Sequence, residues 1–310
     1  MNFMNTTFEN IVIGSRTSLL AKEHVNIFEQ NFKKIFANSK TKIFKKYFKT
    51  TGDKFLDKKI SEIGNKGLFT KEIDQALLNN QINVGIHSLK DLPTELPNGL
   101  EIGAVLKREN FREALISFKN RRLEDLKKNA IVGTSSIRRE MQLKKKRPDL
   151  IIKEIRGNVD TRIRKLRERQ FDAILLACAG LKRLKIVNPY QIIDPRKILP
   201  ALGQGVIALV INKSQKKIRT IIKKFNHENT FIEIDCERIF LKALDGSCKT
   251  PVGGYAKIKN NGRKKKIYFH YIAFSNDGSK LVKENVYFSL NNYKSESYNL
   301  GVRVKQKISN

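Results

Sequence analysis

The 310-residue sequence has no tryptophan, only three cysteines, and 30 acidic against 62 basic residues. Cysteines this few and this unevenly spaced exclude a disulfide framework. No apolar run approaches the roughly 20 residues of a membrane span, and residues 1–10 lack the basic and apolar regions of a signal peptide. These absences predict a reducing, cytoplasmic setting and no membrane partner.

The formal net charge of +32 favours a polyanionic partner, such as nucleic acid, a membrane surface or a small polyanion. A competing explanation is compositional, because the chain is rich in Lys, Asn and Ile, as proteins of AT-biased genomes are. Most lysines are scattered, which suits the second explanation. The arginines are placed more selectively and are treated separately.

One stretch combines a buried strand with chemically capable side chains. The apolar run over residues 82–86 predicts the strand, and Lys90 and Asp91 follow it before Pro93 prevents a helix from continuing. Open α/β sheets bind their ligands at the carboxyl ends of such strands. The alternative is a strand followed by an ordinary solvated turn.

A junction in which a strand is followed by glycine, hydroxyl residues, arginine and a helix occurs twice in the sequence. The strand at residues 11–13 runs into Gly14-Ser15-Arg16-Thr17-Ser18 and a helix, and the strand at residues 130–132 runs into Gly133-Thr134-Ser135-Ser136-Ile137-Arg138-Arg139. Hydroxyl side chains cap helix N-termini, but a cation there opposes the helix dipole. A bound anion would satisfy both the free N–H groups and the arginine.

Arginine recurs at or just after the predicted strand ends. Guanidinium groups bind carboxylates through paired, planar hydrogen bonds that lysine cannot make. Any single one of these arginines is explained by a surface charge or an internal ion pair, but their repetition favours a cleft that binds a polyanion. Neither a P-loop nor a dinucleotide glycine fingerprint is present, which disfavours a nucleotide. The arginines are Arg16, Arg138, Arg139, Arg156, Arg162 and Arg183.

The three cysteines differ in their surroundings. Cys248 lies beside Lys249 in a loop containing Gly, Ser and Pro, where a thiolate is favoured. Cys178 falls in an apolar run that we expect to be a strand, and Cys236 falls on a helix with no activating feature. No metal-ligand spacing is present, because there is no CxxC and the four histidines are dispersed.

The order of the expected elements predicts an α/β protein of three parts. Residues 1–106 with 206–224 form a first βαβ-type lobe, residues 107–205 a second lobe, and residues 225–310 a small α+β domain. The strand at residues 206–211 returns the chain to the first lobe.

Within the last part we expect a linker, a helix, hairpin turns between strand-like runs, and a final helix. These features are the linker at 225–233, the helix at 234–244, turns at Asn261-Gly262 and Asp277-Gly278, and the helix within 290–310.

In the first lobe, residues 50–66 form a long polar connection that we expect to cover the cleft.

Nine segments, in order between residue 11 and about residue 254, resemble one enzyme family, hydroxymethylbilane synthase, also called porphobilinogen deaminase. The segments are GSRTSLLA, NKGLFTKE, HSLKDLP, GTSSIRR, RPDLII, IRGNVDTR, FDAILLACAGLKRL, LPALGQG and DGSCKTPVG.

The resemblance implies two lobes like those of type II periplasmic binding proteins, with a third, smaller domain. It implies a monomeric cytoplasmic transferase of tetrapyrrole (haem) biosynthesis, which joins four porphobilinogen molecules head to tail into hydroxymethylbilane and releases four ammonia. It also implies a dipyrromethane cofactor in thioether linkage to Cys248, with no metal and no nucleic-acid partner.

The resemblance further assigns individual residues. Asp91 matches the catalytic aspartate of the family and Lys90 its neighbour. Each pyrrole ring brings two carboxylates, so the growing chain is a polyanion, which agrees with the arginine-lined cleft. The positions matching those that hold cofactor and chain carboxylates are Arg16, Ser18, Lys66, Ser135, Arg138, Arg139, Arg156, Arg162 and Arg183.

Some positions depart from the family pattern, although none of them is among the residues just named. The departures are Gly246-Ser247 before the cysteine, Thr17, Leu19, Glu62 and Val210-Ile211-Asn212.

Two rival functions are a solute-binding protein of the same two-lobed fold and a nucleic-acid-binding protein. The first is disfavoured by the absent signal peptide and the cysteine loop, and the second by the absence of a recognised binding motif.

Overall fold

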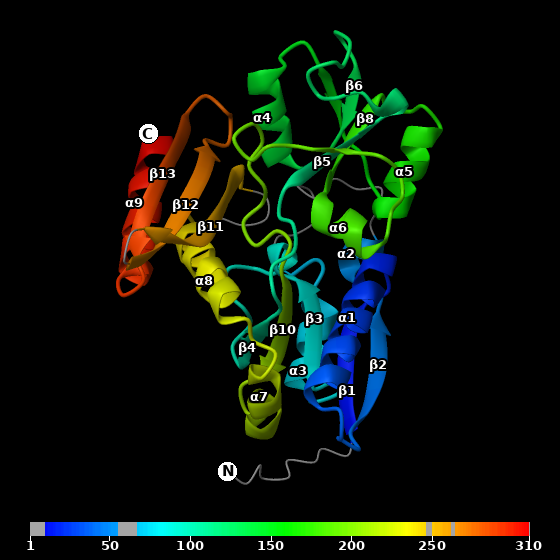
Figure 1. The fold of residues 1–310 in the computed structure, drawn as a ribbon, viewed down its shortest axis with the longest axis vertical. Helices are drawn as coiled ribbons and strands as arrows, with labels where there is room; N and C mark the ends of the chain where they lie inside the picture. Colours follow the sequence, from blue (N-terminus) through cyan, green and yellow to red (C-terminus); the bar gives the residue numbers. More distant parts are fainter. Residues whose placement is uncertain (1–9, 55–66, 246–249, 262–263, 310) are drawn as a thin grey trace. The chain divides into compact units, whose positions relative to one another are not determined.

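A computed structural model describes residues 10–54, 67–245, 250–261 and 264–309 (Figure 1). The chain divides into two compact units, Met1–Arg108 with Val206–Phe231 and Glu109–Gly205 with Ile232–Asn310. The expected boundaries of three separate domains stay a prediction.

The first unit contains a five-stranded mixed sheet of order β2-β1-β3-β10-β4. Strands β1, β2 and β3 run parallel, whereas β10 lies antiparallel between β3 and β4. The expectation that the chain returns to complete this sheet is therefore confirmed. The strands are β1 (Asn10–Arg16), β2 (Lys42–Phe48), β3 (Val84–Ser88), β4 (Leu100–Val105) and β10 (Ile207–Asn212).

Helices cover both faces of this sheet. Helices α1 (Leu19–Ile35) and α7 (Lys216–Lys223) share one apolar core with the sheet. Side chains alternate across a strand, and Gly85 lies on the opposite face, where Ile73 and Leu77 of α3 (Lys71–Leu78) approach it. The short helix α2 (Thr51–Lys54) begins the expected cover, the rest of which lies mostly outside the described residues.

The second unit contains another five-stranded sheet with the equivalent arrangement, of order β7-β6-β8-β5-β9. Strands β6, β7 and β8 are parallel, and β5 lies antiparallel between β8 and β9. The strands are β5 (Glu113–Ser117), β6 (Ile131–Gly133), β7 (Ile151–Lys153), β8 (Ala173–Ala177) and β9 (Gln191–Ile192).

Helix α4 (Ile137–Lys146) covers one face of the second sheet, and α5 (Val159–Arg167) and α6 (Cys178–Arg183) cover the other. The expectation that Cys178 lies in a strand is wrong, because β8 ends one residue earlier and Cys178 begins α6. The apolar run continues through both elements, so its composition does not mark the change from strand to helix. A single 3-10 turn (Phe118–Asn120) follows β5.

The second unit also contains an antiparallel sheet of β11 (Val252–Asn261), β12 (Lys264–Phe274) and β13 (Leu281–Ser289). Helices α8 (Glu228–Ala243) and α9 (Tyr293–Ser309) share its apolar core. The other face meets the second lobe, where Ile272 and Phe274 pack with Leu199. The expected final helix and the turn at Asp277-Gly278 are confirmed, whereas 262–263 lie outside the described residues.

The expected linker at 225–233 is partly wrong, because α8 already begins at Glu228. His227 starts the helix, since its ring Nδ1 accepts from the Thr230 amide at 3.2 Å and its carbonyl accepts from the Phe231 amide at 2.9 Å. Histidine is not among the side chains preferred at this position, which is why the sequence pattern did not indicate the start.

Gly205 and Gly278 are two of the glycines in the second unit that have left-handed backbone conformations, but their surroundings differ. Gly205 has φ +89° and Gly278 has φ +77°. A Cβ on Gly205 would lie 2.6 Å from the Glu109 carbonyl oxygen, whereas one on Gly278 would meet nothing closer than 3.5 Å, at a Met141 methyl group. Gly205 therefore combines a conformational requirement with a steric one.

We predict that Gly278→Ala lowers the free energy of unfolding by about 1–2 kcal/mol, the cost of a left-handed alanine. Gly205→Ala should cost about 1–3 kcal/mol more, because the backbone must also move to relieve the clash. Denaturant titration of both variants measures the difference. Equal losses would show that the contact with Glu109 is relieved without cost.

Candidate active site

In the first unit, the carboxyl ends of β1 and β3 lie at the same edge of the sheet. The two strands are parallel neighbours, with Gly14 opposite Gly85. Ser15 Oγ donates a 3.0 Å hydrogen bond to the Ile86 carbonyl and ties the ends together. Arg16, the last residue of β1, therefore comes to the same edge as the residues that follow β3.

Arg16 and Ser18 occupy the junction between β1 and α1. Ser18 caps the helix, with its Oγ accepting from the Ala21 amide at 3.3 Å. The Arg16 guanidinium lies over the Phe69 ring, 4.3 Å from its centroid. The expected combination of a capped helix N-terminus and a neighbouring cation is thus present, and stacking on Phe69 orients the arginine.

Lys90 and Asp91 lie in the 3-10 turn η1 (Leu89–Asp91) that follows β3. The Leu89 amide donates to the Val206 carbonyl at 3.0 Å, and the Leu92 amide donates to the Leu89 carbonyl at 3.0 Å. Leu89 and Leu92 are buried, whereas Lys90 and Asp91 are half-buried. The backbone is therefore held while the two charged side chains remain accessible.

His87 lies beneath this edge and is 5% exposed. Burial, with the Arg16 charge as the second cause, lowers the pKa of His87 to about 4. Its Nε2 has no hydrogen-bond partner among the described residues. His87 is therefore a neutral imidazole at physiological pH and not a cation of the site.

In the second unit, parallel strands β6, β7 and β8 bring three junctions to one sheet edge. Ser135 follows β6 and donates its Oγ hydrogen to the Ile155 carbonyl. Arg156 follows β7, and its Nε donates to Glu154 Oε1 at 2.5 Å. The second unit thus collects its predicted donors at the edge where the fold predicts a site.

Two further arginines of the second unit have backbone partners. Arg162 Nε, on α5, donates to the Gly157 carbonyl at 2.8 Å. Arg183 Nη2, at the end of α6, donates to the Gly205 carbonyl at 2.6 Å. Burial lowers the pKa of Arg183 to about 10, which still leaves it charged at neutral pH.

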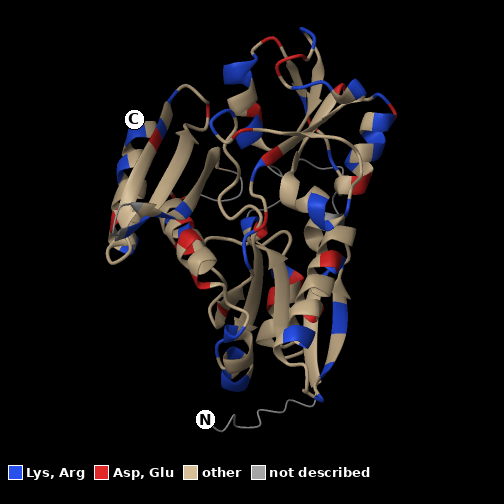
Figure 2. Cartoon of the chain, viewed as in Figure 1, with Lys and Arg blue, Asp and Glu red and all other residues tan. Residues whose placement is uncertain are grey.

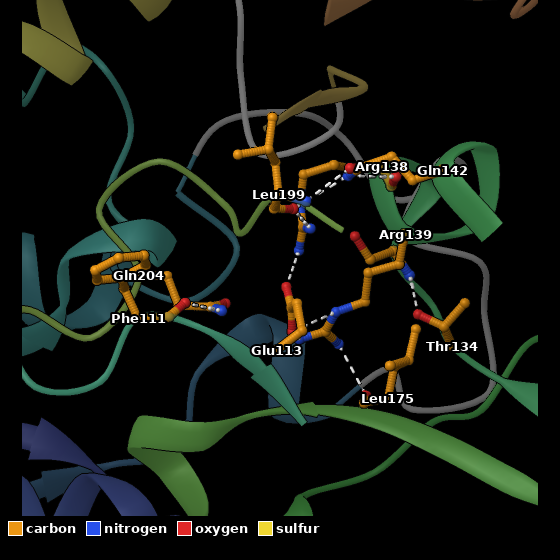
Figure 3. Close-up of polar contacts among 10 residues, drawn as sticks. Phe111, Glu113, Thr134, Arg138, Arg139, Gln142, Leu175, Leu199 and Gln204 are labelled. Atoms are coloured by element: carbon orange, nitrogen blue, oxygen red, sulfur yellow. Dashed lines mark hydrogen bonds and ion pairs between the residues drawn. The ribbon is translucent and has the colours of Figure 1, made fainter. Parts of the chain in front are cut away.

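Arg138 and Arg139 differ from the other arginines in being buried, at 5% and 6% exposed. Figure 3 shows both guanidinium groups pointing at the carboxylate of Glu113. Burial and the neighbouring Arg139 lower the pKa of Arg138 to about 10, against the opposing attraction of Glu113. The pattern of two arginines in a first helical turn predicted charge at this place but not its internal partner.

The sequence interpretation missed Glu113. The residue is fully buried at the start of β5, although its sequence neighbourhood, Arg112-Glu113-Ala114-Leu115-Ile116, contains a detectable signal. A carboxylate that opens an otherwise apolar strand is buried only when it is paired. Excess arginine elsewhere in the chain supplies the partner.

The structure also bears on the cysteines. Cys178 and Cys236 are buried free thiols, and burial raises the pKa of both, that of Cys178 to about 11. Both are therefore poor nucleophiles at neutral pH. Cys248 and Lys66 lie outside the described residues, so their predicted roles stay predictions.

Two negative findings concern the described segments. They contain no group of three or more His, Cys, Asp or Glu side chains arranged to hold a metal ion. None of their helices has the length and apolar character that a membrane span requires.

Comparison with known families identifies the chain. The model "Porphobilinogen deaminase, dipyromethane cofactor binding domain" matches residues 11–220, and "Porphobilinogen deaminase, C-terminal domain" matches residues 231–310. The chain belongs to the porphobilinogen deaminase family. The porphobilinogen deaminase of Rickettsia bellii is 43% identical over 274 residues, covering 88% of this chain and 90% of that protein. That of Bacillus subtilis is 42% identical over 278 residues, covering 89% and 87%.

Porphobilinogen deaminase condenses porphobilinogen to hydroxymethylbilane and carries a dipyrromethane cofactor. The reaction and the cofactor expected from the sequence are thus confirmed at the level of the family. The expected fold, an α/β protein with two βαβ-type lobes and a small C-terminal α+β domain, is confirmed. The strand orders above add that each lobe has a mixed five-stranded sheet and that the C-terminal sheet is antiparallel.

Two solved periplasmic proteins resemble the chain weakly. The periplasmic VFT2 domain of BvgS from Bordetella pertussis has a TM-score of 0.41 at 9% identity, covering 70% of this chain and 86% of that one. The alkanesulfonate-binding protein SsuA from Xanthomonas axonopodis pv. citri has a TM-score of 0.37 at 13% identity, covering 77% and 76%.

The described donors fit the chemistry of a dipyrromethane. Two pyrrole rings bring four carboxylates, and both units present arginine beside a hydroxyl group at the edge of parallel strands. In the first unit the pair is Arg16 and Ser18, and in the second it is Ser135 and Arg156. Each unit of the deaminase thus offers the cationic donors that carboxylates require.

We predict that stability of the deaminase falls as the pH drops from 6.5 towards 4, through protonation of His87. The folded-state pKa of about 4 lies below the ordinary 6.5, so the unfolded state binds more protons in this window. At pH 5 the loss from this group is about 2 kcal/mol. Denaturant titrations at pH 7 and pH 5 should show a smaller loss for His87→Asn than for the wild type. An equal loss would remove His87 as the cause.

Proposed function

We propose that this porphobilinogen deaminase carries its dipyrromethane on Cys248 and uses Asp91 as the catalytic carboxylate, with Lys90 beside it. Two parallel-strand edges, each presenting arginine and hydroxyl donors, support this assignment most directly. The bound dipyrromethane supplies the pyrrole carbon to which substrate units are added. The chain's own residues bind carboxylates, orient rings and stabilise charge.

The carboxylate-binding role falls to residues at both sheet edges. Bidentate hydrogen bonds to arginine fix a carboxylate in position as well as neutralising it. Ser135 donates its hydroxyl hydrogen to the Ile155 carbonyl, so the hydroxyl must rotate before it can donate to a ligand. The proposed cofactor- and chain-binding residues are Arg16, Ser18, Lys66, Ser135, Arg138, Arg139, Arg156, Arg162 and Arg183.

Asp91 is proposed to act on the substrate pyrrole. Loss of ammonia from porphobilinogen leaves positive charge on the ring, and a nearby carboxylate stabilises that charge while accepting the pyrrole N–H. The backbone bonds that hold η1 on Val206 keep the carboxylate in place, so little reorganisation is needed as the charge develops. Lys90 is proposed to attract substrate carboxylates.

The distribution of charge supports a small-molecule partner. Figure 2 shows Lys and Arg spread over the helices of both units rather than gathered on one element, as expected if most lysines reflect composition. We therefore propose that porphobilinogen is the partner, that nucleic acid is not, and that the enzyme is a cytoplasmic monomer. The predicted three-domain division, with the cofactor on the third domain, belongs to the same proposal.

The attachment of the cofactor can be tested by intact mass. Cys248→Ser should give folded protein that lacks the mass of two condensed pyrrole units, because a hydroxyl does not form the thioether. Cys178→Ser and Cys236→Ser are the controls and should keep that mass, since both thiols are buried and burial raises the pKa of both. A normal cofactor mass on the Cys248 variant would move the attachment elsewhere.

Two substitutions separate charge from shape at Asp91. Asp91→Asn keeps the shape and removes the charge, so turnover should fall by ~100-fold or more. Asp91→Glu keeps the charge but moves it by one methylene, so measurable turnover should remain, with chain intermediates accumulating. Both variants should fold, because Asp91 is only half-buried. Release of ammonia or bilane from porphobilinogen is the assay, and a near-normal rate for Asp91→Asn would exclude Asp91 from the mechanism.

A further inference from the structure

A single carboxylate holds two buried arginines in the second unit. Glu113 Oε1 lies 2.8 Å from Arg138 Nη2, and Oε2 lies 2.7 Å from Arg139 Nη2 and 3.1 Å from its Nε. Glu113 is fully buried, and the arginines are 5% and 6% exposed. One negative and two positive charges leave this group with a net charge of +1.

Backbone carbonyls fix the direction of each guanidinium further. Arg139 Nη1 donates to the Leu175 carbonyl at 2.9 Å, and Arg138 Nη1 donates to the Leu199 carbonyl at 2.5 Å. Gln142 holds Leu199 from both sides, donating to its carbonyl at 3.1 Å and accepting from its amide at 2.7 Å (Figure 3). Side chains from β5 and α4, the backbone in the middle of β8 and the backbone at Leu199 therefore form one network.

The network continues to β11, the strand that follows Cys248 in the sequence. The Gly254 amide on β11 donates to the Pro200 carbonyl at 2.8 Å. A Cβ on Gly253 would lie 3.0 Å from both Arg138 Cδ and the Pro200 carbonyl oxygen. Strand β11 starts at Val252, four residues after Cys248 in the sequence. Arg138 thus packs against the first residues of that strand.

We propose that Glu113 is a positioning residue for loading of the cofactor, aiming Arg138 and Arg139 at its carboxylates and, through Arg138 and Leu199, seating the start of β11. This rests on the proposed function, in which the two arginines bind those carboxylates. Glu113 itself touches neither cofactor nor substrate.

The charge balance explains why a carboxylate is needed here. With Glu113 ionised, the group has a net charge of +1, and one incoming carboxylate neutralises it. Without that charge, two buried guanidiniums repel each other at close range, and each gains by turning towards water. An amide cannot replace the carboxylate, because it has one acceptor oxygen and would set its own N–H groups against an arginine.

The test compares variants at two carboxylates of the same unit, each of which pairs with arginine. Glu113→Gln and Glu113→Asp alter the proposed positioning group. Asp149→Asn is the matched control, because Asp149 accepts from Arg147 Nε at 2.8 Å and Nη2 at 2.6 Å. Arg147 holds the carbonyls of Leu123 and Leu126 and not those of Leu199 or Leu175.

The readout is the rate at which apoprotein gains the cofactor mass when incubated with porphobilinogen, followed by intact mass well below the melting temperature of every variant. We expect Glu113→Gln to load about 10- to 100-fold more slowly than wild type, the loss of a charged hydrogen bond. Glu113→Asp should load at an intermediate rate, because charge is kept but displaced. Asp149→Asn should melt at a lower temperature and load at the wild-type rate.

Arg139→Leu separates failure of this proposal from failure of the proposed function. Wild-type loading of Glu113→Gln, with slow loading of Arg139→Leu, would overturn the positioning role alone. Wild-type loading of both would instead overturn carboxylate binding by the arginine pair. If Glu113→Gln does not fold, Glu113→Asp decides, and a wild-type rate there would overturn the proposal. If Asp149→Asn loads the cofactor as slowly as the Glu113 variants, slow loading is a consequence of lost stability, and the positioning role of Glu113 would be overturned.

Discussion

The ion pairs of Glu113 with Arg138 and Arg139 are the interaction on which the second lobe depends. They join strand β5 to helix α4, and the arginines extend the connection to the middle of β8 and to Leu199. Removing one partner of a buried pair leaves an uncompensated charge, at a cost of about 3–5 kcal/mol. Burial makes these ion pairs stabilising, and it also restricts the orientation of both guanidinium groups. The contacts that stabilise the lobe therefore also orient the two cations.

The two lobes follow one principle at different places in the chain. Parallel strands end at a common edge, and serine hydroxyls at or just beyond the strand ends donate to backbone carbonyls of a neighbouring segment, Ser15 to Ile86 and Ser135 to Ile155. The backbone from which the arginine side chains at such an edge extend is therefore held in place, whereas the lysines of Figure 2 are scattered over the helices. A ligand with a carboxylate pair on every ring requires this arrangement, which relates the fold to the chemistry of a porphobilinogen deaminase.

Local signals made much of the fold and site predictable. The junctions after β1 and β6 were found because strand, glycine, hydroxyl and arginine are consecutive, and the return of β10 followed from an apolar run after a glycine-rich segment. The burial of Glu113 has a local signal, a carboxylate that opens an apolar strand, but its pairing with Arg138 and Arg139 was not predictable locally, because these arginines lie on another element. The start of α8 at His227 and the helical position of Cys178 were missed for a different reason, since the first uses an uncommon cap and the second lies in an unbroken apolar run.

The most direct test of the central claim, that positioned arginines hold the carboxylates of a cofactor on Cys248, is a crystal structure of the holoenzyme. The account predicts a carboxylate oxygen of the cofactor at about 2.7–2.9 Å from a guanidinium nitrogen of Arg138 or Arg139, with both arginines still bonded to Glu113. A cofactor whose carboxylates bind only lysines or water, while the two arginines bond to Glu113 and backbone carbonyls alone, would contradict it.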